Sequence, residues 1–267
     1  MGDAKRLVVK PISSTDANRI VRALHYSGKI VNNSQVHLGV FMDGKCGGAM
    51  QFGPSLDKRK IRGLVTGTLW NEFIELNRMA FADWLPRNGE SRCIGYAMRW
   101  LRKTYPWLKW VVSFADGTQC GDGTIYRASG FVLTGIKENN QIWQAPDGGE
   151  TTTRLVATDT RRPERTRLLS RVSVTKGKHV MENGAASMKP FIDSGWKPKP
   201  GFQLRYIYFL DPTARERLTV PILPFSDIDR LGAGMYRGKK RVVSDTSDTP
   251  GDQPGEGGAT PTTTLQY

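Results

Sequence analysis

The chain has 267 residues, and its 39 Lys and Arg against 25 Asp and Glu give a formal net charge of +14. Residues 245–267 contain four acidic residues and neither Lys nor Arg, so residues 1–244 carry a net charge of +18. This positive charge indicates a polyanionic partner such as nucleic acid, and the alternative is that it serves solubility alone. The lack of an apolar run of about 20 residues and of a signal peptide argues against a membrane partner, and the three dispersed cysteines argue against a disulfide scaffold.

The N-terminal part predicts a helix, a hairpin and a basic loop. A helix is expected over residues 14–26, capped by Ser13 or Ser14. Two strands are expected over residues 36–40 and 46–52. They flank Asp43-Gly44, a pair that is typical of a hairpin turn. Residues 54–70 then form a long loop whose basic side chains are candidates for DNA binding. They are Lys58, Arg59, Lys60 and Arg62.

The middle of the chain predicts a site for a pyrophosphate. A strand over 73–81 is followed by the pattern [R/Q]-x-x-G-x-[G/A], an amphipathic stretch over 95–103 and a strand over 110–115. A small-residue turn that opens a helix leaves free N–H groups for an anion. The expected cofactor-binding residues are Arg92, Gly95, Tyr96 and Ala97. The alternative is an ordinary helix start without a ligand.

The next elements complete a recognisable order. A short helix is expected to end at Gly130 in the left-handed conformation, and strands follow over 131–136 and 202–210. This order resembles the GNAT acetyltransferases. The resemblance implies an α/β (α+β) fold over residues 1–210, a GNAT-like central mixed sheet flanked by helices. It also implies acetyl-CoA or a related acyl-CoA, whose thioester lies in the splay between the fourth and fifth strands.

Residues 138–201 are a basic insertion before the last strand. Arg161, Arg162 and Arg165 belong to a run of six arginines that contains two acidic residues. Three aromatic residues interleave with the basic stretch. They are Trp143, Phe191 and Trp196. This composition suits phosphate contact with base stacking, and the alternative is a solvated basic face over a small satellite core.

The C-terminal region divides by composition. Residues 211–244 form a basic extension in which Lys239 and Lys240, within a run from Arg237 to Arg241, are candidates for phosphate binding. Residues 245–267 are rich in Thr, Gly, Pro and Asp, so a disordered acidic tail is expected there.

Four short strings give a closer resemblance. They are His25-Tyr26-Ser27, Glu75-Leu76-Asn77-Arg78-Met79, Ser113-Phe114-Ala115-Asp116-Gly117 and Gly123-Thr124-Ile125-Tyr126. Together they resemble the Mom proteins of bacteriophages, as far as about residue 131. The resemblance implies an enzyme that modifies adenine in double-stranded phage DNA, in the cytoplasm of the host bacterium, and so blocks restriction nucleases. It implies functional roles for His25, Tyr26, Arg78, Asp116 and Tyr126.

Each of these residues also has an alternative explanation. His25 is suited to accept a proton from an amine, or it caps the preceding helix. Arg78, within an apolar strand, and Asp116, at the end of the next, either serve the reaction or form a salt bridge with each other. The GNAT resemblance implies that Tyr126 protonates a departing thiolate.

The product that the Mom resemblance implies, a carbamoylmethyl group on the adenine amine, contains a nitrogen that acetyl-CoA does not supply. A metal such as iron is therefore considered, with His25 and Asp116 as possible ligands, although their spacing is not diagnostic. Two other functions remain open. One is an ordinary acetyltransferase of a protein or small-molecule amine, and the other is a DNA-binding protein without catalysis.

Overall fold

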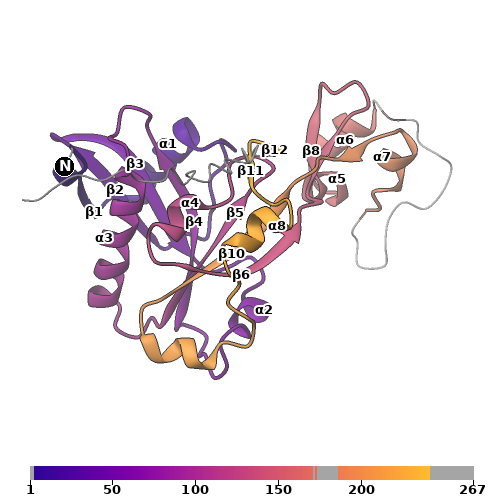
Figure 1. Ribbon diagram of the computed structural model, residues 1–267. Helices are drawn as coiled ribbons and strands as arrows, with labels where there is room; N and C mark the ends of the chain where they lie inside the picture. The colour runs from indigo at the N-terminus through magenta and orange to yellow at the C-terminus, as the bar shows by residue number, and fades with distance from the viewer. Residues whose placement is uncertain (1–2, 171, 173–185, 241–267) are drawn as a thin grey trace, which may run out of the picture.

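The computed structural model describes residues 3–170, 172 and 186–240. Its centre is a mixed sheet of seven strands in the order β1-β2-β3-β4-β5-β10-β6 (Figure 1). These strands are β1 Val8–Pro11, β2 Val36–Met42, β3 Lys45–Gly53, β4 Phe73–Phe81, β5 Trp110–Asp116, β6 Val132–Glu138 and β10 Phe202–Phe209. The expected mixed α/β fold with a GNAT-like order of strands is confirmed.

Helices cover both faces of this sheet. They are η1 Asp3–Arg6, α1 Ser14–Leu24, α2 Lys58–Arg62, α3 Gly89–Thr104, α4 Thr124–Arg127, η2 Pro212–Arg217 and α8 Ser226–Arg230. Ala49 packs against α1, whereas its neighbour Met50 joins the core formed with α3. Because consecutive residues of a strand point to opposite faces, α1 and α3 lie on opposite sides. Within the described residues, no helix is both long and apolar enough to span a membrane.

The predicted hairpin is confirmed. Strands β2 and β3 pair antiparallel from Val36–Phe52 to Met42–Lys45. Asp43 and Gly44 have φ values of 50° and 81°, the left-handed geometry that a two-residue hairpin turn requires.

Strands β4 and β5 diverge, as the fold prediction required. They run parallel and pair only from Phe73–Trp110 to Glu75–Val112. Beyond this point β4 continues beside β3, and β5 continues beside β10. A register shift in the β3–β4 ladder leaves Asn77 without a partner in the register, so β4 has a bulge immediately before Arg78. The splay opens a space at this end of the sheet.

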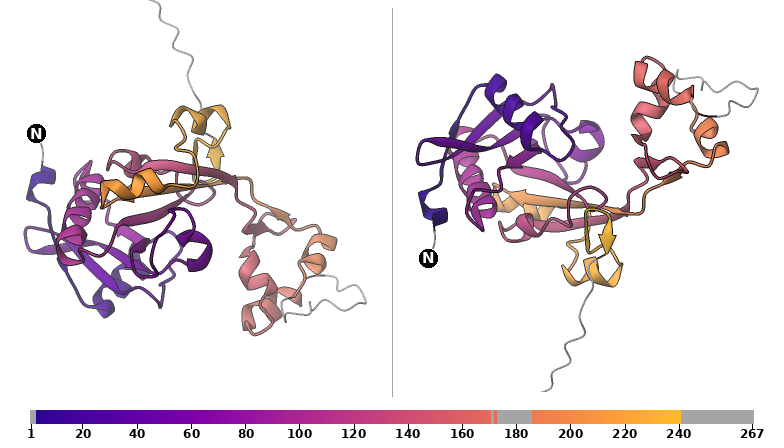
Figure 2. Two further views of the ribbon diagram at one scale, coloured as in Figure 1. Left: turned by 90° about the horizontal axis from the view of Figure 1, so that it is seen from below. Right: turned by 90° about the horizontal axis from the view of Figure 1, so that it is seen from above.

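The insertion forms a small unit of its own, which Figures 1 and 2 show standing apart from the main sheet. Its elements are β7 Ile142–Gln144, β8 Thr151–Thr153, α5 Arg154–Thr158, α6 Pro163–Leu169, α7 Lys189–Asp193 and β9 Lys197–Pro198. Trp143, Phe191 and Trp196 are buried in its core. The satellite core is therefore confirmed, and stacking of these three aromatic rings on bases is wrong, because a buried ring is not available.

Other expectations need correction, fall outside the described residues or stay predictions. The loop expected over 54–70 contains a helix, α2, and the helix expected over 14–26 ends at Leu24. Helix α3 begins at Gly89, six residues before the expected start. The expected disordered tail and Arg241 lie outside the described residues, and the domain boundary at residue 210 stays a prediction.

Candidate active site

One cavity of about 970 Å³ lies at the β4–β5 splay. All five residues expected to be catalytic line it, although they come from four separate segments. They are His25, Tyr26, Arg78, Asp116 and Tyr126. The structure therefore brings these residues together, while their roles stay predictions.

His25 follows α1, and its backbone N–H caps that helix by donating to the Val21 carbonyl at 3.0 Å. The ring is held by Ser27, whose backbone N–H donates to Nδ1 at 3.2 Å. Burial, together with the charge of Arg78, lowers the pKa of His25 to about 4. The ring is neutral near pH 7, and because Nδ1 accepts, its proton lies on Nε2. His25 is thus the C-cap residue of α1, as the alternative expected, and its neutral ring adds no charge to the end of the helix.

Tyr26 lies against His25, with ring centroids 4.2 Å apart, and half of its surface is exposed. Burial of the hydroxyl group, with a further contribution from Asp116, raises the pKa of Tyr26. The phenol therefore stays protonated at neutral pH, and its exposed ring offers an apolar surface at the cavity.

Arg78 is held by backbone carbonyls. Its Nε donates to the Lys29 carbonyl at 3.0 Å, and Nη1 donates to the Asn77 carbonyl at 2.7 Å. No ion pair joins Arg78 to Asp116 in the part of the chain that the structure describes, so the expected structural salt bridge is wrong. Burial lowers the pKa of Arg78, and the guanidinium still carries its charge at neutral pH.

Asp116 ends β5, and its carboxylate is oriented by three donors. They are the Thr118 backbone N–H at 2.9 Å, Gln119 Nε2 at 2.8 Å and Asn139 Nδ2 at 2.9 Å. A carboxylate held in this way is a fixed hydrogen-bond acceptor at the cavity.

Tyr126 lies in α4 and is 7% exposed. Its ring packs against Tyr206 and Phe131, with centroid distances of 5.3 and 5.4 Å. Burial raises the pKa of Tyr126 to about 12. The hydroxyl group therefore keeps its proton at neutral pH, in the wall of the cavity.

The predicted pyrophosphate turn is displaced from where the pattern put it. Arg92, Gly95, Tyr96 and Ala97 lie inside α3, and Arg92 N–H already donates to the Asn88 carbonyl at 3.3 Å. The free N–H groups of the helix are those of its first turn, near Glu90 and Ser91. The sequence signal was present in Pro86-Arg87-Asn88-Gly89, a run typical of a turn.

A second cavity, of about 330 Å³, lies at this first turn of α3. Arg87, Gly89 and Ser91 line it. Glu90, Thr124 and Ile125 line both cavities, so the two adjoin. Because the N-terminus of a helix attracts anions, this cavity is placed to hold an anion, whereas residues 92–97 lie inside the helix.

The cavity is also lined by Asp57, Glu75, Glu90 and Asp122, and two of these carboxylates, which were not anticipated as functional residues, have a shifted pKa. Glu75 lies on β4, and Glu90 lies in the first turn of α3. Burial raises the pKa of both carboxyl groups. An acidic residue within an apolar strand was the signal that could have identified Glu75.

The C-terminal extension reaches the same cavity. Its strands β11 Met235–Tyr236 and β12 Lys239–Lys240 form a hairpin, and Tyr236, Lys239 and Lys240 line the cavity. Tyr236, which is 61% exposed, forms a backbone bridge with Gly121. Only the tertiary structure shows that these lysines line the same cavity as the five candidate residues.

Helix α2 borders the cavity through Asp57 and Ile61. Lys58 Nζ lies over the Trp70 ring at 4.7 Å, and the Arg62 guanidinium carbon lies 5.7 Å from it. Arg59 and Lys60 are exposed. Their contact with DNA stays a prediction.

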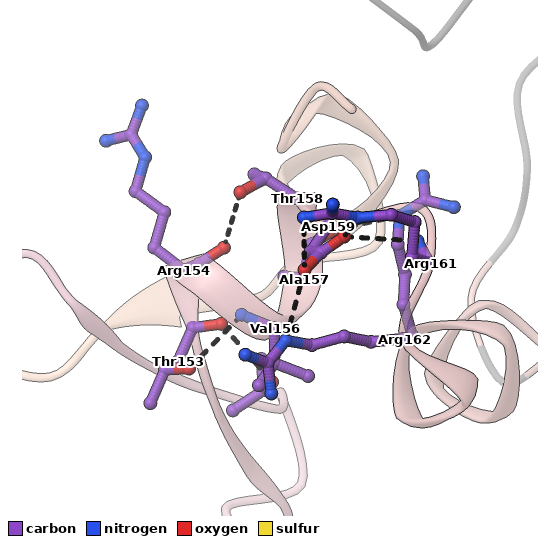
Figure 3. A network of polar contacts seen from close by, with 10 residues as sticks. Thr153, Arg154, Val156, Ala157, Thr158, Asp159, Arg161 and Arg162 are labelled. Carbon is purple, nitrogen blue, oxygen red and sulfur yellow. Dashed lines mark hydrogen bonds and ion pairs between the residues drawn. The ribbon is translucent and has the colours of Figure 1, made fainter. Parts of the chain in front are cut away.

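The arginines of the insertion make contacts within the insertion itself (Figure 3). Arg161 and Arg162 both donate from Nε to the Asp159 carboxylate, at 3.0 and 3.3 Å. Arg165 Nε donates to the Ala157 carbonyl at 2.9 Å. The Arg161 side chain is 88% exposed, which leaves it the most accessible of the three for a phosphate.

Metal binding is not supported by a cluster of ligands. The described residues contain no group of three or more His, Cys, Asp and Glu side chains arranged to hold an ion. Of the two possible ligands, His25 Nδ1 already accepts from the Ser27 backbone N–H.

The comparisons with known proteins agree with this arrangement. Residues 6–227 match the Mom protein family. The methylcarbamoylase mom of Escherichia phage Mu is 43% identical over 137 residues, which are 51% of this chain and 56% of that protein. The match thus spans about half the length of this relative.

Solved structures similar to this chain include two acetyltransferases. The ribosomal-protein-S18-alanine N-acetyltransferase of Escherichia coli is 10% identical, with 77% of this chain and 94% of that chain covered and a TM-score of 0.37. The spermidine/spermine N-acetyltransferase of Vibrio cholerae is 9% identical, with 80% and 99% covered and a TM-score of 0.39. Scores this low carry no functional conclusion. Because the family match covers residues 6–227, which is most of this chain, the chain belongs to the Mom protein family.

Proposed function

We propose that this chain is an enzyme that modifies adenine in double-stranded phage DNA, in the cytoplasm of the host bacterium, and so protects the DNA from restriction. Membership of the Mom family and the likeness to the phage Mu methylcarbamoylase support this function. The observation that carries it is the shared cavity, where the five expected residues meet Lys239 and Lys240. Lys239 and Lys240 at the cavity, with the exposed Arg59 and Lys60 on the adjoining α2, fit a polyanion, and they are not needed for a small-molecule amine, which was the alternative.

An acyl-CoA fits the two adjoining cavities. Its pyrophosphate would lie on the first turn of α3, with Arg87 and Ser91 beside it. When bound it would supply carbon activated as a thioester, and the nitrogen of the carbamoylmethyl group would have to come from a separate nitrogen donor. Tyr126 would hold a proton at its hydroxyl oxygen for a departing thiolate, because its pKa is raised to about 12 by burial.

The adenine amine is paired inside a duplex, so the base must leave the stack to enter the cavity. Tyr26 would stack on the extruded ring through its exposed face. Asp116 would accept a hydrogen bond from the exocyclic amine, because its carboxylate is already oriented by three donors. An acceptor here favours adenine, which presents a donor at this position.

A residue other than His25 is the better candidate for the proton acceptor. A neutral ring with its proton on Nε2 and a pKa of about 4, lowered by burial, is suited to donate a hydrogen bond and is a weak base. Glu75 is the better acceptor, because burial raises the pKa of its carboxyl group. We therefore assign His25 to donate a hydrogen bond to the carbonyl oxygen of the acyl group, and Arg78 to compensate negative charge beside it.

The test is mass spectrometry of nucleosides from the DNA of cells that express the chain. The expected product is adenine with a carbamoylmethyl group, which differs from acetyl-adenine by one NH unit. His25→Ala, Arg78→Ala and Asp116→Ala should abolish the product and leave the gel-shift affinity for duplex DNA nearly unchanged, because phosphate contacts set affinity. Unmodified DNA in cells with soluble wild-type protein would overturn the proposed function.

A further inference from the structure

Leu56 is the most exposed of the large apolar side chains in the described residues, at 95%. It lies in the loop between β3 and α2 and lines the catalytic cavity together with His25 and Asp116. An isolated exposed leucine is common on protein surfaces. One that stands at the edge of a catalytic cavity, with its side chain almost wholly in solvent, is placed to contact whatever enters the cavity.

The loop that carries Leu56 is fixed to the catalytic strand. The Pro54 carbonyl accepts from Asn33 Nδ2 at 3.2 Å and from Asn77 Nδ2 at 3.4 Å. A side chain on Gly53 would come within 2.6 Å of the Asn33 carbonyl oxygen and of Asn77 Oδ1, so the backbone approaches both residues closely. Asn77 is the bulge residue beside Arg78, which ties the position of Leu56 to that of Arg78.

The residues after Leu56 are suited to hold a phosphate backbone. Asp57 caps α2 by accepting from the Lys60 backbone N–H at 3.2 Å. The helix then presents Arg59 and Lys60 to solvent, and Arg62 follows one turn later. A duplex whose phosphates lie on α2 would bring its stacked bases toward the adjoining leucine and the cavity.

We propose, on the basis of the function proposed above, that Leu56 is a wedge that enters the base stack and occupies the space left by the extruded adenine. Apolar side chains are the kind that proteins insert between base steps, where they offset part of the cost of unstacking. Leu56 would then be a positioning residue, which acts on the position of the base and leaves the chemistry to the cavity behind it.

The test compares Leu56→Ala, Leu56→Met and the matched control Leu69→Ala, which removes a leucine that is 66% exposed and lies outside the cavity lining. Two measurements are made. One is modified adenine in the DNA of expressing cells. The other is the fluorescence of 2-aminopurine placed at adenine positions in a set of duplexes, with saturating purified protein. This fluorescence rises when the base leaves the stack, and it does not require turnover.

Leu56→Ala should lower both modification and the fluorescence rise by about tenfold, because extrusion is no longer supported. Leu56→Met should restore both, and Leu69→Ala should match the wild type. When 2-aminopurine is placed opposite a mismatched base, Leu56→Ala should approach the wild-type fluorescence, since the base is already unpaired. Wild-type modification or fluorescence in Leu56→Ala would overturn the wedge. Unmodified DNA with the wild-type protein would instead overturn the proposed function.

Discussion

The backbone N–H of Gly238 donates to the carbonyl of Gly117 at 3.0 Å. Together with the Arg237 N–H, which donates to the Cys120 carbonyl at 2.8 Å, this bond fastens the C-terminal hairpin to the loop that follows β5. That loop begins directly after Asp116. The hairpin therefore brings Lys239 and Lys240 to the cavity, although more than 100 residues separate them from Asp116 in sequence.

These two lysines should contribute to DNA binding. Replacing both Lys239 and Lys240 by Ala should weaken binding to duplex DNA and reduce the slope of log affinity against log salt by about two, one for each phosphate that a lysine neutralises. Fluorescence anisotropy at several salt concentrations measures the slope. The control replaces Arg102 and Lys103, in the last turn of α3, by Ala. An unchanged slope in the variant that lacks Lys239 and Lys240 would show that these lysines do not contact phosphate.

Two substitutions distinguish the two positions at which a pyrophosphate could bind, the first turn of α3 and residues 92–97. Ser91→Asp puts a carboxylate into the cavity at the first turn of α3 and should weaken binding of coenzyme A at least tenfold. Gly95→Asp should have a smaller effect, because a side chain there meets nothing closer than Arg99 Nη1 at 3.7 Å. Isothermal titration calorimetry of both variants is the measurement, and the reverse order of affinities would restore the site at residues 92–97.

Replacing Glu75 should change stability and activity in opposite directions. Its folded pKa is raised by burial, so the folded state disfavours the charged form and loses stability as the pH rises from the ordinary value of 4.5 toward the folded pKa. Glu75→Gln should therefore raise the melting temperature at pH 7, with the gain vanishing near pH 4, where the carboxyl group is protonated in both states. The same variant should lose modification activity, because it cannot accept a proton. A less stable Glu75→Gln at pH 7 would contradict the burial argument.

The His25 ring should remain neutral at pH values well below the ordinary pKa of histidine. Its pKa is lowered to about 4 by burial, so its contribution to stability is present above pH 6.5 and is lost as the pH falls toward 4. Two-dimensional NMR of the labelled ring should show the Nε2–H tautomer at pH 7 and a midpoint near 4. A midpoint near 6.5 would instead support His25 as the proton acceptor. Ser27→Ala removes the hydroxyl group 2.8 Å from Nδ1 and should still leave the Nε2–H tautomer, since the backbone N–H of residue 27 continues to donate to Nδ1.

Local chemistry in the sequence determined most of the secondary structure. Asp43-Gly44 required a hairpin because few other pairs adopt left-handed geometry at both positions, and Gly130 adopts the predicted positive φ of 83°. The family strings placed the five candidate residues correctly in one cavity. Their proximity came from resemblance, since spacing alone could not bring His25 to Asp116.

Tertiary structure decided what depends on contacts between distant segments. The start of α3 was missed because the six-residue pattern lies inside the helix, whereas Asn88, which precedes the helix with a positive φ of 64°, makes no side-chain capping bond. The burial of Trp143, Phe191 and Trp196 and the approach of Lys239 to the cavity follow from packing and from the Gly238–Gly117 bond. Composition gives the type and number of side chains, and only the folded backbone decides which of them face a core, a cavity or solvent.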